Sequence, residues 1–448
     1  MKNLNLIRVF LTCILLLGAA DVESHIGLAL YDEQKNIIFI WTALAIAFPK
    51  FSIPFLLGGF GLSYFFPYFA DVYVDNQKIM VLSFAIPLLL FVIIGSFKTN
   101  GKAFTGLLIT FLLLPFVYNG TGQDYKDIIV HLAIDSTAML GMILNIITGM
   151  VFLFVALGII VLNTGLVDLI IKYVLKYVKS PGRIAILSSS IFGSVSGSAL
   201  ANVMSTGQVT IPLMKSVGYS PRLAAAYESV ASTGGQLLPP IMGAAAFIMA
   251  ELLNIGYWDV VYYASLPAIA FYLLLLIKCP KGEVKTNYEP RKLQFPDAKV
   301  CAEKIGEAMH GMIILGAGIG CMIGVLDQTG LVYLITDILL TLSDNSTTLL
   351  LIVTALLSII LGLGMPTGAA YVVVALITAP ALIDAGFTDI WAHMFVLYFA
   401  TLSMISPPVA IASYGAAKIA DSNPITTSLT SMYVAWPLYV IPFIFIWF

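Results

Sequence analysis

The stretch from Ser188 to Glu251 is apolar enough to lie within a membrane, but it contains two clusters of small and hydroxylated residues. The first cluster covers residues 193–198, Gly-Ser-Val-Ser-Gly-Ser, and the second covers residues 232–235, Ser-Thr-Gly-Gly, followed by Pro239-Pro240. In hydrocarbon, an interrupted helix leaves backbone N–H and C=O groups without partners, so interruptions persist only where protein buries them or where they line a polar cavity. Secondary transporters build their ion and substrate sites from such helices near the bilayer midplane. This stretch therefore predicts a membrane protein with a binding site inside the lipid bilayer.

The amino-acid composition of the whole chain also indicates a membrane protein. The chain has 448 residues, of which 60% are hydrophobic and 10% are charged, whereas soluble globular domains carry about 25% charged residues. At roughly 17–25 residues for each apolar span, there is room for about a dozen crossings of the bilayer. No basic patch suggests a nucleic-acid partner, and no pair among the four cysteines has metal-ligand spacing. The four histidines are far apart, so no transition-metal site is indicated either.

The N-terminal part, residues 1–130, has little polarity within its apolar spans, and we expect it to be scaffold. Its first segment, from Arg8 to Ala20, is a cleaved signal peptide or, as we favour, a first transmembrane helix with a cytoplasmic N-terminus. Apolar spans follow at about 37–48, 51–70, 79–97 and 103–118. The connections that contain Lys50, Lys98 and Lys102 are expected to face the cytoplasm.

From about residue 131 the chain repeats itself. Residues 164–167, Thr-Gly-Leu-Val, recur at 329–332, an offset of 165. Further along the offset is 168, and it relates five pairs of landmarks: Thr210 and Thr378, Pro212 and Pro380, Gly218 and Gly386, Thr233 and Thr401, Pro239-Pro240 and Pro407-Pro408. These coincidences in register predict an internal duplication. The first copy covers 131–277, a hydrophilic cytoplasmic linker covers 278–304, and the second copy covers 305–448.

The charges of the connections indicate that the copies are inverted relative to each other. The connections of the first copy on either side of its first cluster are basic, with Lys172, Lys176, Lys179, Arg183, Lys215 and Arg222. The matching connections of the second copy hold Asp344, Asp384 and Asp389 without Lys or Arg. Since Lys and Arg favour the cytoplasmic side, equivalent loops should lie on opposite sides of the membrane. Inverted repeats of this kind are common among secondary transporters.

The same charges predict re-entrant segments. Arg183 and Lys215 are expected on one side of the membrane, although about 30 mostly apolar residues separate them. We therefore expect a re-entrant hairpin with its tip at 193–198, and a counterpart over about 347–382 with its tip at 362–368. Each is followed by a helix interrupted at a Pro-Pro pair, over 224–251 and 391–420. The predicted fold is an all-α polytopic membrane protein with an inverted-topology repeat, two re-entrant hairpins and two discontinuous helices.

The polar clusters suit sodium as the coupling ion. Packing through a GxxxG spacing would explain Gly193 and Gly197 but not the hydroxyls beside them. Hydroxyls and unwound carbonyls supply the neutral oxygens that a hard cation takes at interrupted helices. We expect two roughly equivalent sodium sites. Candidate ligands of the first site are Gly193, Ser194, Ser196, Gly197, Ser198, Ser232, Thr233, Gly234 and Gly235, and those of the second are Gly364, Thr367, Gly368, Thr401, Ser403 and Ser406.

Half-helix N-termini aimed at the gap between these sites would favour an anionic substrate. The residues that we expect to contact it are Asn202, Glu228, Pro239, Pro366 and Pro407. Glu228 lies in apolar sequence about one turn before Ser232, and an intramembrane carboxylate is a functional candidate by default. The other interpretation left open is a residue at a helix end that pairs with Arg222 or Lys215.

Other classes of protein fit less well. The sequence has no P-loop that would hold the phosphates of ATP, so no ATPase and no cofactor are expected. An intramembrane serine protease is disfavoured because Val195 stands where a nucleophile elbow needs its serine. A channel would show a continuous polar stripe without occluding hairpins, and a membrane enzyme would need a clustered acid, base or metal set. We therefore expect a secondary transporter rather than an enzyme.

Three motifs carry a family resemblance: IFGSVSGSALANVMSTGQVTIPLMKSVGYSP, ESVASTGGQLLPPIMGAAAFIMAE and LGLGMPTGAAYV. They resemble the large membrane subunit of tripartite ATP-independent periplasmic (TRAP) transporters. The likeness is closer to the fused permeases that work with TAXI-type binding proteins. It is dense over about residues 131–440, whereas residues 1–118 match only in their hydrophobic pattern and would stand for the small subunit.

The resemblance implies sodium-coupled uptake at the cell inner membrane, commonly of organic acids, delivered by a separate extracytoplasmic binding protein. It also implies an elevator-type motion, in which hairpins and interrupted helices slide against a fixed scaffold. The family's sodium-binding regions carry over onto residues 193–198, 232–235, 364–368 and 403–407. The alternative function is a sodium- or proton-coupled carboxylate carrier that needs no binding protein.

Overall fold

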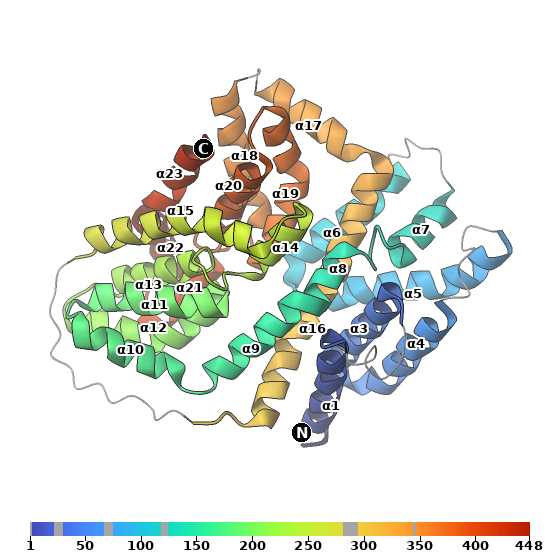
Figure 1. Ribbon diagram of the computed structural model, residues 1–448, viewed down its shortest axis with the longest axis horizontal. Coiled ribbons are helices and arrows are strands. Elements are labelled where there is room, and N and C mark those ends of the chain that lie inside the picture. The colour runs from blue at the N-terminus through green and yellow to red at the C-terminus, as the bar shows by residue number, and fades with distance from the viewer. Residues whose placement is uncertain (1, 22–29, 67–74, 118–123, 281–293, 344–345) are drawn as a thin grey trace. The chain divides into compact units, whose positions relative to one another are not determined.

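A computed structural model describes residues 2–21, 30–66, 75–117, 124–280, 294–343 and 346–448 (Figure 1). These residues form helices and connecting turns, with no strand among them. By their contacts they group into two compact units. Unit 1 comprises Met1–Ile159 with Pro296–Leu334, and unit 2 comprises Ile160–Phe295 with Ile335–Phe448. The grouping concerns contacts and not duplication, so the boundaries of the two copies stay a prediction. Much of the expected linker, residues 281–293, lies outside the described residues.

Unit 1 combines the N-terminal helices with one long helix from later in the chain. Its helices are α1 (Lys2–Ala19), α3 (Asp32–Ala47), α4 (Ser52–Phe65), α5 (Asp75–Thr99), α6 (Gly101–Val117), α7 (Tyr125–Ile134), α8 (Met142–Ile146) and α16 (Ala298–Thr329). A π-helical turn, η3 (Ile147–Val151), follows α8, and α9 (Phe152–Leu162) then crosses into unit 2. The spans expected at 8–20, 37–48, 51–70, 79–97 and 103–118 correspond to α1, α3, α4, α5 and α6 over their described parts.

The 32-residue helix α16 is the centre of unit 1, and it packs against α1, α3, α5, α6, α7 and α8. It begins at an Asp297 cap, whose side chain accepts a hydrogen bond from Lys299 N at 2.8 Å. Small residues allow close packing along it. A Cβ on Gly320 would lie 2.5 Å from the carbonyl oxygen of Ala138, in the non-helical segment between α7 and α8.

A buried amide holds that non-helical segment in place. Asn36 on α3 is 1% exposed, and its Nδ2 donates to Leu140 O at 2.8 Å and to Asn145 Oδ1 at 2.5 Å. In an apolar interior, a carbonyl released from a helix costs free energy unless it finds a donor. Asn36 therefore allows the chain to leave the helical conformation between α7 and α8.

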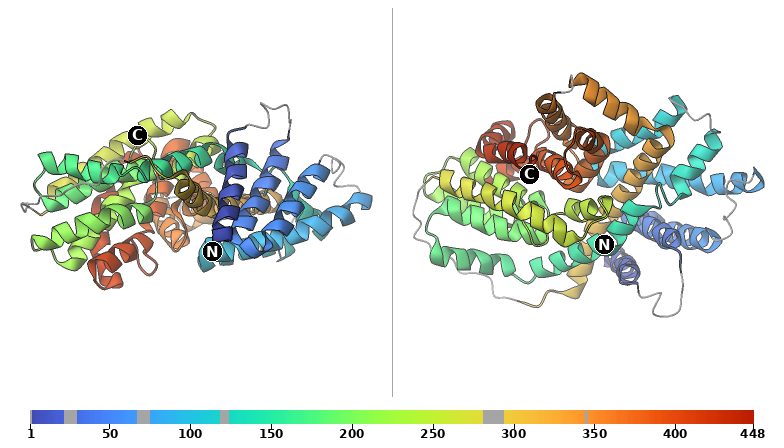
Figure 2. Two further views of the ribbon diagram at one scale, coloured as in Figure 1. Left: turned by 90° about the horizontal axis from the view of Figure 1, so that it is seen from below. Right: turned by 45° about the horizontal axis from the view of Figure 1, so that its top comes forward.

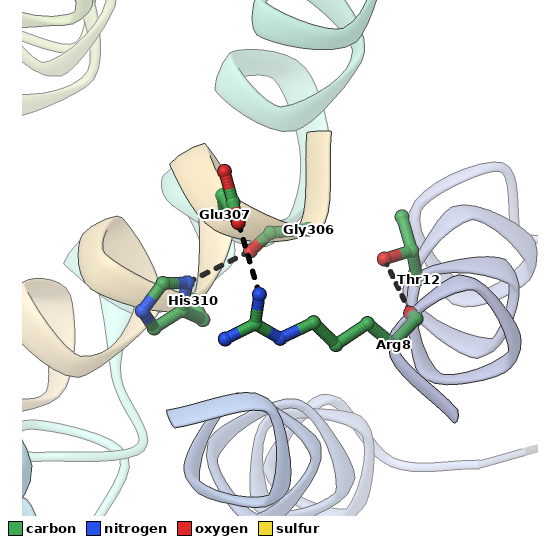
Figure 3. A network of polar contacts seen from close by, with 5 residues as sticks. All are labelled: Arg8, Thr12, Gly306, Glu307 and His310. Atoms are coloured by element: carbon green, nitrogen blue, oxygen red, sulfur yellow. Dashed lines mark hydrogen bonds and ion pairs between the residues drawn. The ribbon is translucent and has the colours of Figure 1, made fainter. Parts of the chain in front are cut away.

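Near the N-terminus of unit 1, an ion pair joins α1 to α16. Arg8 Nη1 lies 3.0 Å from Glu307 Oε1, and Figure 3 shows the arginine side chain reaching across from its helix. In the same region, His310 Nδ1 lies 2.9 Å from Gly306 O and Thr12 Oγ1 donates to Arg8 O at 2.9 Å. The charged side chains are partly exposed, at 35% for Arg8 and 57% for Glu307, so their contribution to stability is small.

Unit 2 contains both expected hairpins and both Pro-Pro pairs. Its helices are α10 (Leu166–Tyr177), α11 (Pro181–Ser196), α12 (Ala199–Ser216), α13 (Pro221–Gly235), α14 (Ala244–Leu252), α15 (Tyr257–Lys278), α18 (Thr347–Gly362), α19 (Thr367–Asp384), α20 (Asp389–Leu402), α21 (Ile411–Ala420), α22 (Pro424–Val434) and α23 (Trp436–Phe445). Helix α17 (Leu331–Leu342) begins in unit 1 and ends in unit 2. The views of Figure 2 show the green helices of the first copy beside the orange and red helices of the second within this unit.

Equivalent helices of the two copies have matching lengths: 12 residues for α10 and α17, 16 for α11 and α18, and 18 for α12 and α19. The copies also exchange contacts. Helix α12 packs against α21, and its counterpart α19 packs against α14, so each hairpin contacts the second half of the other copy's interrupted helix. A serine cluster joins the copies as well, because Ser431 Oγ lies 2.9 Å from Ser229 Oγ and 3.0 Å from Ser413 Oγ.

The helices are those of a polytopic membrane protein. Within the described residues, five helical stretches are long and apolar enough to cross a membrane: Val81–Thr99, Met142–Val161, Tyr257–Lys278, Ala298–Thr329 and Thr367–Asp384. The bent pair α22 and α23, at 41°, would be a sixth. This is fewer than the dozen crossings for which the chain has room, because helices such as α6, α18 and α20 are apolar but shorter than a full span.

Candidate ion and substrate site

The first hairpin consists of α11 and α12, which pack against each other and are joined through Gly197 and Ser198 (Figure 1). Helix α11 begins with Pro181 in its first turn, where a missing N–H costs nothing, and ends at Gly197 with a left-handed φ of 61°. Ser198 then caps α12 by accepting from Ala201 N at 3.4 Å. The tip is thus a two-residue turn, with Arg183 and Lys215 toward the opposite end of the pair.

The first interrupted helix runs alongside this hairpin. Helix α13 ends at Gly235 and α14 begins at Ala244, so the chain is not helical through Pro239-Pro240. Proline lacks an N–H and clashes with the preceding turn, and two in succession end a helix. The non-helical segment is bonded to the hairpin, because Met242 N donates to Ser194 O at 3.1 Å.

The hairpin and the interrupted helix meet at two glycines. A Cβ on Gly193 would lie 2.7 Å from Gly235 Cα, and a Cβ on Gly235 would lie 2.6 Å from Gly193 Cα. The structure therefore brings the two predicted polar clusters of the first copy together. A Cβ on Gly234, in contrast, would clash with the ring of Phe271 on α15.

At this junction some buried hydroxyls have no hydrogen-bond partner among the described residues. Ser196 Oγ at the tip and Thr233 Oγ1 near the end of α13 belong to this group. Thr233 is fully buried. A buried hydroxyl without a partner costs about 1–3 kcal/mol. These oxygens are therefore the positions at which a bound cation would restore lost interactions.

The second copy repeats this arrangement with different polar contacts. Gly364, with a φ of 76°, lies between α18 and α19, and α20 ends at Leu402 before α21 begins at Ile411. Ser403 Oγ lies 3.0 Å from Gly362 O, so the second tip also contacts the second interruption.

The remaining candidates of the second copy are placed as follows. Thr401 Oγ1 donates to Leu397 O at 2.7 Å and Ser406 Oγ donates to Leu402 O at 2.9 Å. Thr367 is 8% exposed at the start of α19. Near it, a Cβ on Gly368 would lie 3.9 Å from Ala244 Cβ, which places the second hairpin against the start of α14. Of the prolines expected to contact substrate, Pro366 is exposed and Pro239 and Pro407 are partly exposed.

Glu228 lies on α13 and is fully buried. Its Oε1 accepts from Ser189 Oγ at 2.7 Å, Thr206 Oγ1 at 2.5 Å and Ser232 Oγ at 3.2 Å, and its Oε2 accepts from Thr210 Oγ1 at 2.5 Å. Within the described part of the chain, no Lys or Arg nitrogen forms an ion pair with this carboxyl group. The interpretation in which Glu228 pairs with Arg222 or Lys215 is therefore wrong for this conformation. Lys215 Nζ instead donates to Ala420 O at 2.8 Å.

Asn202, the remaining predicted substrate residue, is also fully buried and belongs to this network. Its Nδ2 donates to Ser189 O at 2.7 Å, and Thr206 Oγ1 lies 3.1 Å from its Oδ1. Our sequence reasoning missed Ser189, Thr206 and Thr210. Residues 202, 206 and 210 recur every four positions in apolar sequence, which places them on one face of a helix, and this spacing was the signal.

The second copy lacks this cluster. At the offset of 168, Thr206 corresponds to Val374 and Glu228 to Val396, while Thr210 corresponds to Thr378. The second copy has another buried polar contact instead, between Tyr371 Oη on α19 and His393 Nδ1 on α20 at 2.7 Å. The duplicated backbone thus carries different buried chemistry in its two halves.

Interrupted helices, paired with hairpins in a protein with several membrane-crossing helices, define a membrane protein built like a secondary transporter. The family follows from comparison with known proteins. The chain belongs to the family described as tripartite ATP-independent periplasmic transporter, DctM component, whose model matches residues 79–311 and 291–448. The members of this family are transporter permeases and not enzymes. The match begins at residue 79, before the residue 131 at which the sequence resemblance became dense.

Two curated relatives match short parts of the chain. The uncharacterized protein y4mL of Sinorhizobium fredii is 29% identical over 114 residues, which are 25% of this chain and 27% of that protein. The uncharacterized protein YgiK of Salmonella typhimurium is 36% identical over 63 residues, which are 13% of this chain and 14% of that protein. The matches thus span about a quarter and about a seventh of these relatives, and their names assign no activity.

Proposed function

We propose that this chain is the permease of a sodium-coupled secondary transporter, which imports an organic acid or a similar small anionic solute at the cell inner membrane. One observation carries the proposal: in a chain of the DctM family, each hairpin tip contacts the interruption of a neighbouring helix, through Gly193 with Gly235 and Gly362 with Ser403. Interrupted helices of this kind supply unwound backbone and inward-facing helix ends, which bind ions and anionic groups.

Sodium is the coupling ion that the first junction favours. The oxygens of Ser196 and Thr233 are neutral, buried and without hydrogen-bond partners among the described residues. A hard monovalent cation would satisfy them without introducing a carboxylate. Gly193, Ser194, Gly197, Ser198, Ser232 and Gly235 lie at the same junction and could add backbone or hydroxyl oxygens. In the second copy we propose Gly364, Thr367, Gly368, Thr401, Ser403 and Ser406 for an equivalent site.

The substrate is proposed to bind where both interruptions are accessible. Pro239 and Pro407 are partly exposed within the interruptions, and Pro366 is exposed at the second tip. Helices α14 and α21 begin just after the interruptions, and their N-terminal N–H groups would favour the carboxylate of an organic acid.

The partner and the motion are also part of the proposal. We propose that a TAXI-type extracytoplasmic binding protein delivers the substrate. Of residues 1–130, those from 79 onward match the large component, so we propose that only the residues before 79 stand for a fused small subunit. Both hairpins and both interrupted helices fall within unit 2, whereas α1 to α8 fall within unit 1. This grouping supports an elevator mechanism in which unit 2 carries the ions and substrate as one body. The alternative is a carboxylate carrier that needs no binding protein.

Uptake by the purified chain in proteoliposomes tests these points. The measurement compares a labelled organic acid with and without an inward sodium gradient, and with and without the candidate binding protein. Uptake should require both. Uptake that persists without the binding protein would favour the alternative carrier. Uptake that ignores sodium but follows a pH gradient would overturn the choice of coupling ion.

A further inference from the structure

Helix α10 is too short to cross a membrane. Its 12 residues measure about 18 Å, whereas the hydrocarbon core of a bilayer is about 30 Å thick. One side of the helix is covered by protein, because Ile171 and Val174 are buried and the helix packs against α11 of the first hairpin (Figure 1). The chemistry of its other side therefore indicates what surrounds it.

The exposed side of α10 carries two parallel stripes. An apolar stripe consists of Leu169, Tyr173 and Tyr177, which are 41%, 62% and 64% exposed. Beside it lie Lys172 and Lys176, which are also exposed and one turn apart. The stripes touch, because Lys176 Nζ lies 5.5 Å from the centre of the Tyr177 ring. An apolar stripe next to a basic one is the pattern of a helix in the membrane interface, with tyrosines toward the acyl chains and lysines toward the headgroups.

The two lysines belong to a strongly basic segment. Residues 166–183 hold four basic residues and one acidic residue, Asp168. Within the described part of the chain, none of the four basic residues forms an ion pair. Lys179 follows the helix and is exposed, and Arg183 Nε is buried without a hydrogen-bond partner among the described residues. The segment therefore has an excess of positive charge beside an apolar stripe.

The second copy repeats the shape of α10 without its charge. At the offset of 165, the apolar stripe recurs on α17 as Leu334, Ile338 and Leu342, which are all exposed. The positions of the two helical lysines are taken by Asp337 and Thr341, both exposed as well. The duplicated fold thus requires the apolar stripe but not the lysines. The charge of α10 therefore has a purpose of its own, and it complements an anion.

We propose that α10 is a docking site for anionic phospholipids, in which Lys172, Lys176 and Lys179 bind the headgroup phosphates and Tyr173 and Tyr177 lie against the upper acyl chains. Anionic lipids are concentrated in the cytoplasmic leaflet, and each lysine near them strengthens binding by about fivefold. Helix α10 leads into α11, so bound lipid would hold the base of the first hairpin at the membrane surface. The site goes beyond the proposed sodium and substrate sites, and lipid binding does not depend on the proposed transport function.

Native mass spectrometry of the purified full-length protein in detergent tests the proposal without any uptake assay, so its failure is separate from a failure of the proposed function. The probes are phosphatidylglycerol, which is anionic, and phosphatidylcholine, which carries no net charge. We expect the unmodified protein to prefer phosphatidylglycerol. The triple variant Lys172→Gln, Lys176→Gln, Lys179→Gln should lose about tenfold or more of its affinity for this lipid, with its affinity for phosphatidylcholine unchanged.

The matched control removes the same charge elsewhere on the chain. It is the triple variant Lys50→Gln, Lys102→Gln, Lys299→Gln, whose lysines are exposed and form no ion pair among the described residues. The control should lose much less affinity for phosphatidylglycerol. Equal losses in the two triple variants, or equal affinity of the unmodified protein for the two lipids, would overturn the proposal.

Fluorescence quenching in lipid nanodiscs keeps the test decisive if the α10 triple variant does not fold. Tyr173→Cys in a Cys13→Ser background is labelled with a fluorophore, since the other three cysteines are buried. The nanodiscs contain both lipids, and only one of them has brominated acyl chains, which quench on contact. Brominated phosphatidylglycerol should quench more than brominated phosphatidylcholine, and high salt should reduce the difference by screening the charges.

Ile338→Cys, at the equivalent position of α17, is the matched control and should be quenched equally by the two lipids. Equal quenching by the two lipids at residue 173 would contradict the site on α10. A preference for phosphatidylglycerol that is as strong at residue 338 as at residue 173 would contradict it too.

Discussion

Gly193 and Gly235 are in backbone contact, because a Cβ on Gly193 would lie 2.7 Å from Gly235 Cα. One belongs to the first hairpin and the other ends the first half of an interrupted helix. The contact brings together two clusters that are about 40 residues apart in sequence. A Cβ on Gly235 would meet only backbone atoms, and a Cβ on Gly193 would meet the backbone of Gly235 and also Asn202 Nδ2 at 2.6 Å, so a side chain has no room at either position.

Gly193→Ala should therefore destabilise the protein by about 1–3 kcal/mol through overpacking. We expect a lower melting temperature for the purified variant in detergent and reduced uptake in proteoliposomes. Gly106→Ala is the matched control, because a Cβ at this helical glycine would meet no atom within 4 Å. Equal melting temperatures for Gly193→Ala and Gly106→Ala would show that the close contact does not exist.

The unpartnered hydroxyls at the same junction lead to a second prediction. Ser196→Ala and Thr233→Ala should raise the sodium concentration needed for half-maximal uptake several-fold without lowering the melting temperature, because neither hydroxyl has a hydrogen-bond partner to lose among the described residues. The control is Ser190→Ala on the same helix, whose hydroxyl already donates to Leu187 O at 2.9 Å. Sodium titrations that are alike in all three variants would exclude these hydroxyls as ligands.

A third prediction concerns unit 1. Asn36→Leu should cost about 1–3 kcal/mol, because Leu140 O would remain buried without its donor. Arg8→Gln should cost less than about 1 kcal/mol, since the ion pair with Glu307 is partly exposed and solvent screens it. Thermal unfolding of both variants measures the difference. A larger loss of stability from Arg8→Gln than from Asn36→Leu would contradict the role of the buried amide in holding the segment between α7 and α8.

Features that depend on local sequence could be predicted. Apolar runs bounded by Lys predicted the positions of α3 to α6. Glycines and prolines predicted the hairpin tips and the interruptions at Pro239-Pro240 and Pro407-Pro408. Backbone sterics and hydrophobicity decide these features, and both are visible in a single segment.

Features that depend on contacts between segments could not be predicted. The hydroxyls of Ser189, Thr206 and Thr210 became relevant only when α11 and α12 were placed against Glu228. The non-helical segment between α7 and α8 likewise depends on Asn36, about 100 residues away. The side chain that satisfies a released carbonyl can lie anywhere in the sequence, so a local pattern does not reveal it.

The proposed pair of opposed ion sites depends most on the inversion of the two copies, and thiol labelling at two equivalent positions tests this inversion directly. Ser220 and Thr388 are exposed, precede α13 and α20, and form no cap hydrogen bond with their side chains, so Ser220→Cys and Thr388→Cys are a matched pair. Both are made in a Cys13→Ser background. The other three cysteines are buried, and burial raises the pKa of the Cys279 thiol, which slows its reaction because the thiolate is the nucleophile.

A membrane-impermeant thiol reagent is then applied to intact cells and to inverted membrane vesicles, with labelling after solubilisation in detergent as the control for reactivity. If the two copies are inverted, Thr388→Cys should react only in intact cells and Ser220→Cys only in inverted vesicles. Labelling of both positions from the same side would contradict the inverted arrangement and, with it, the proposed pair of opposed ion sites.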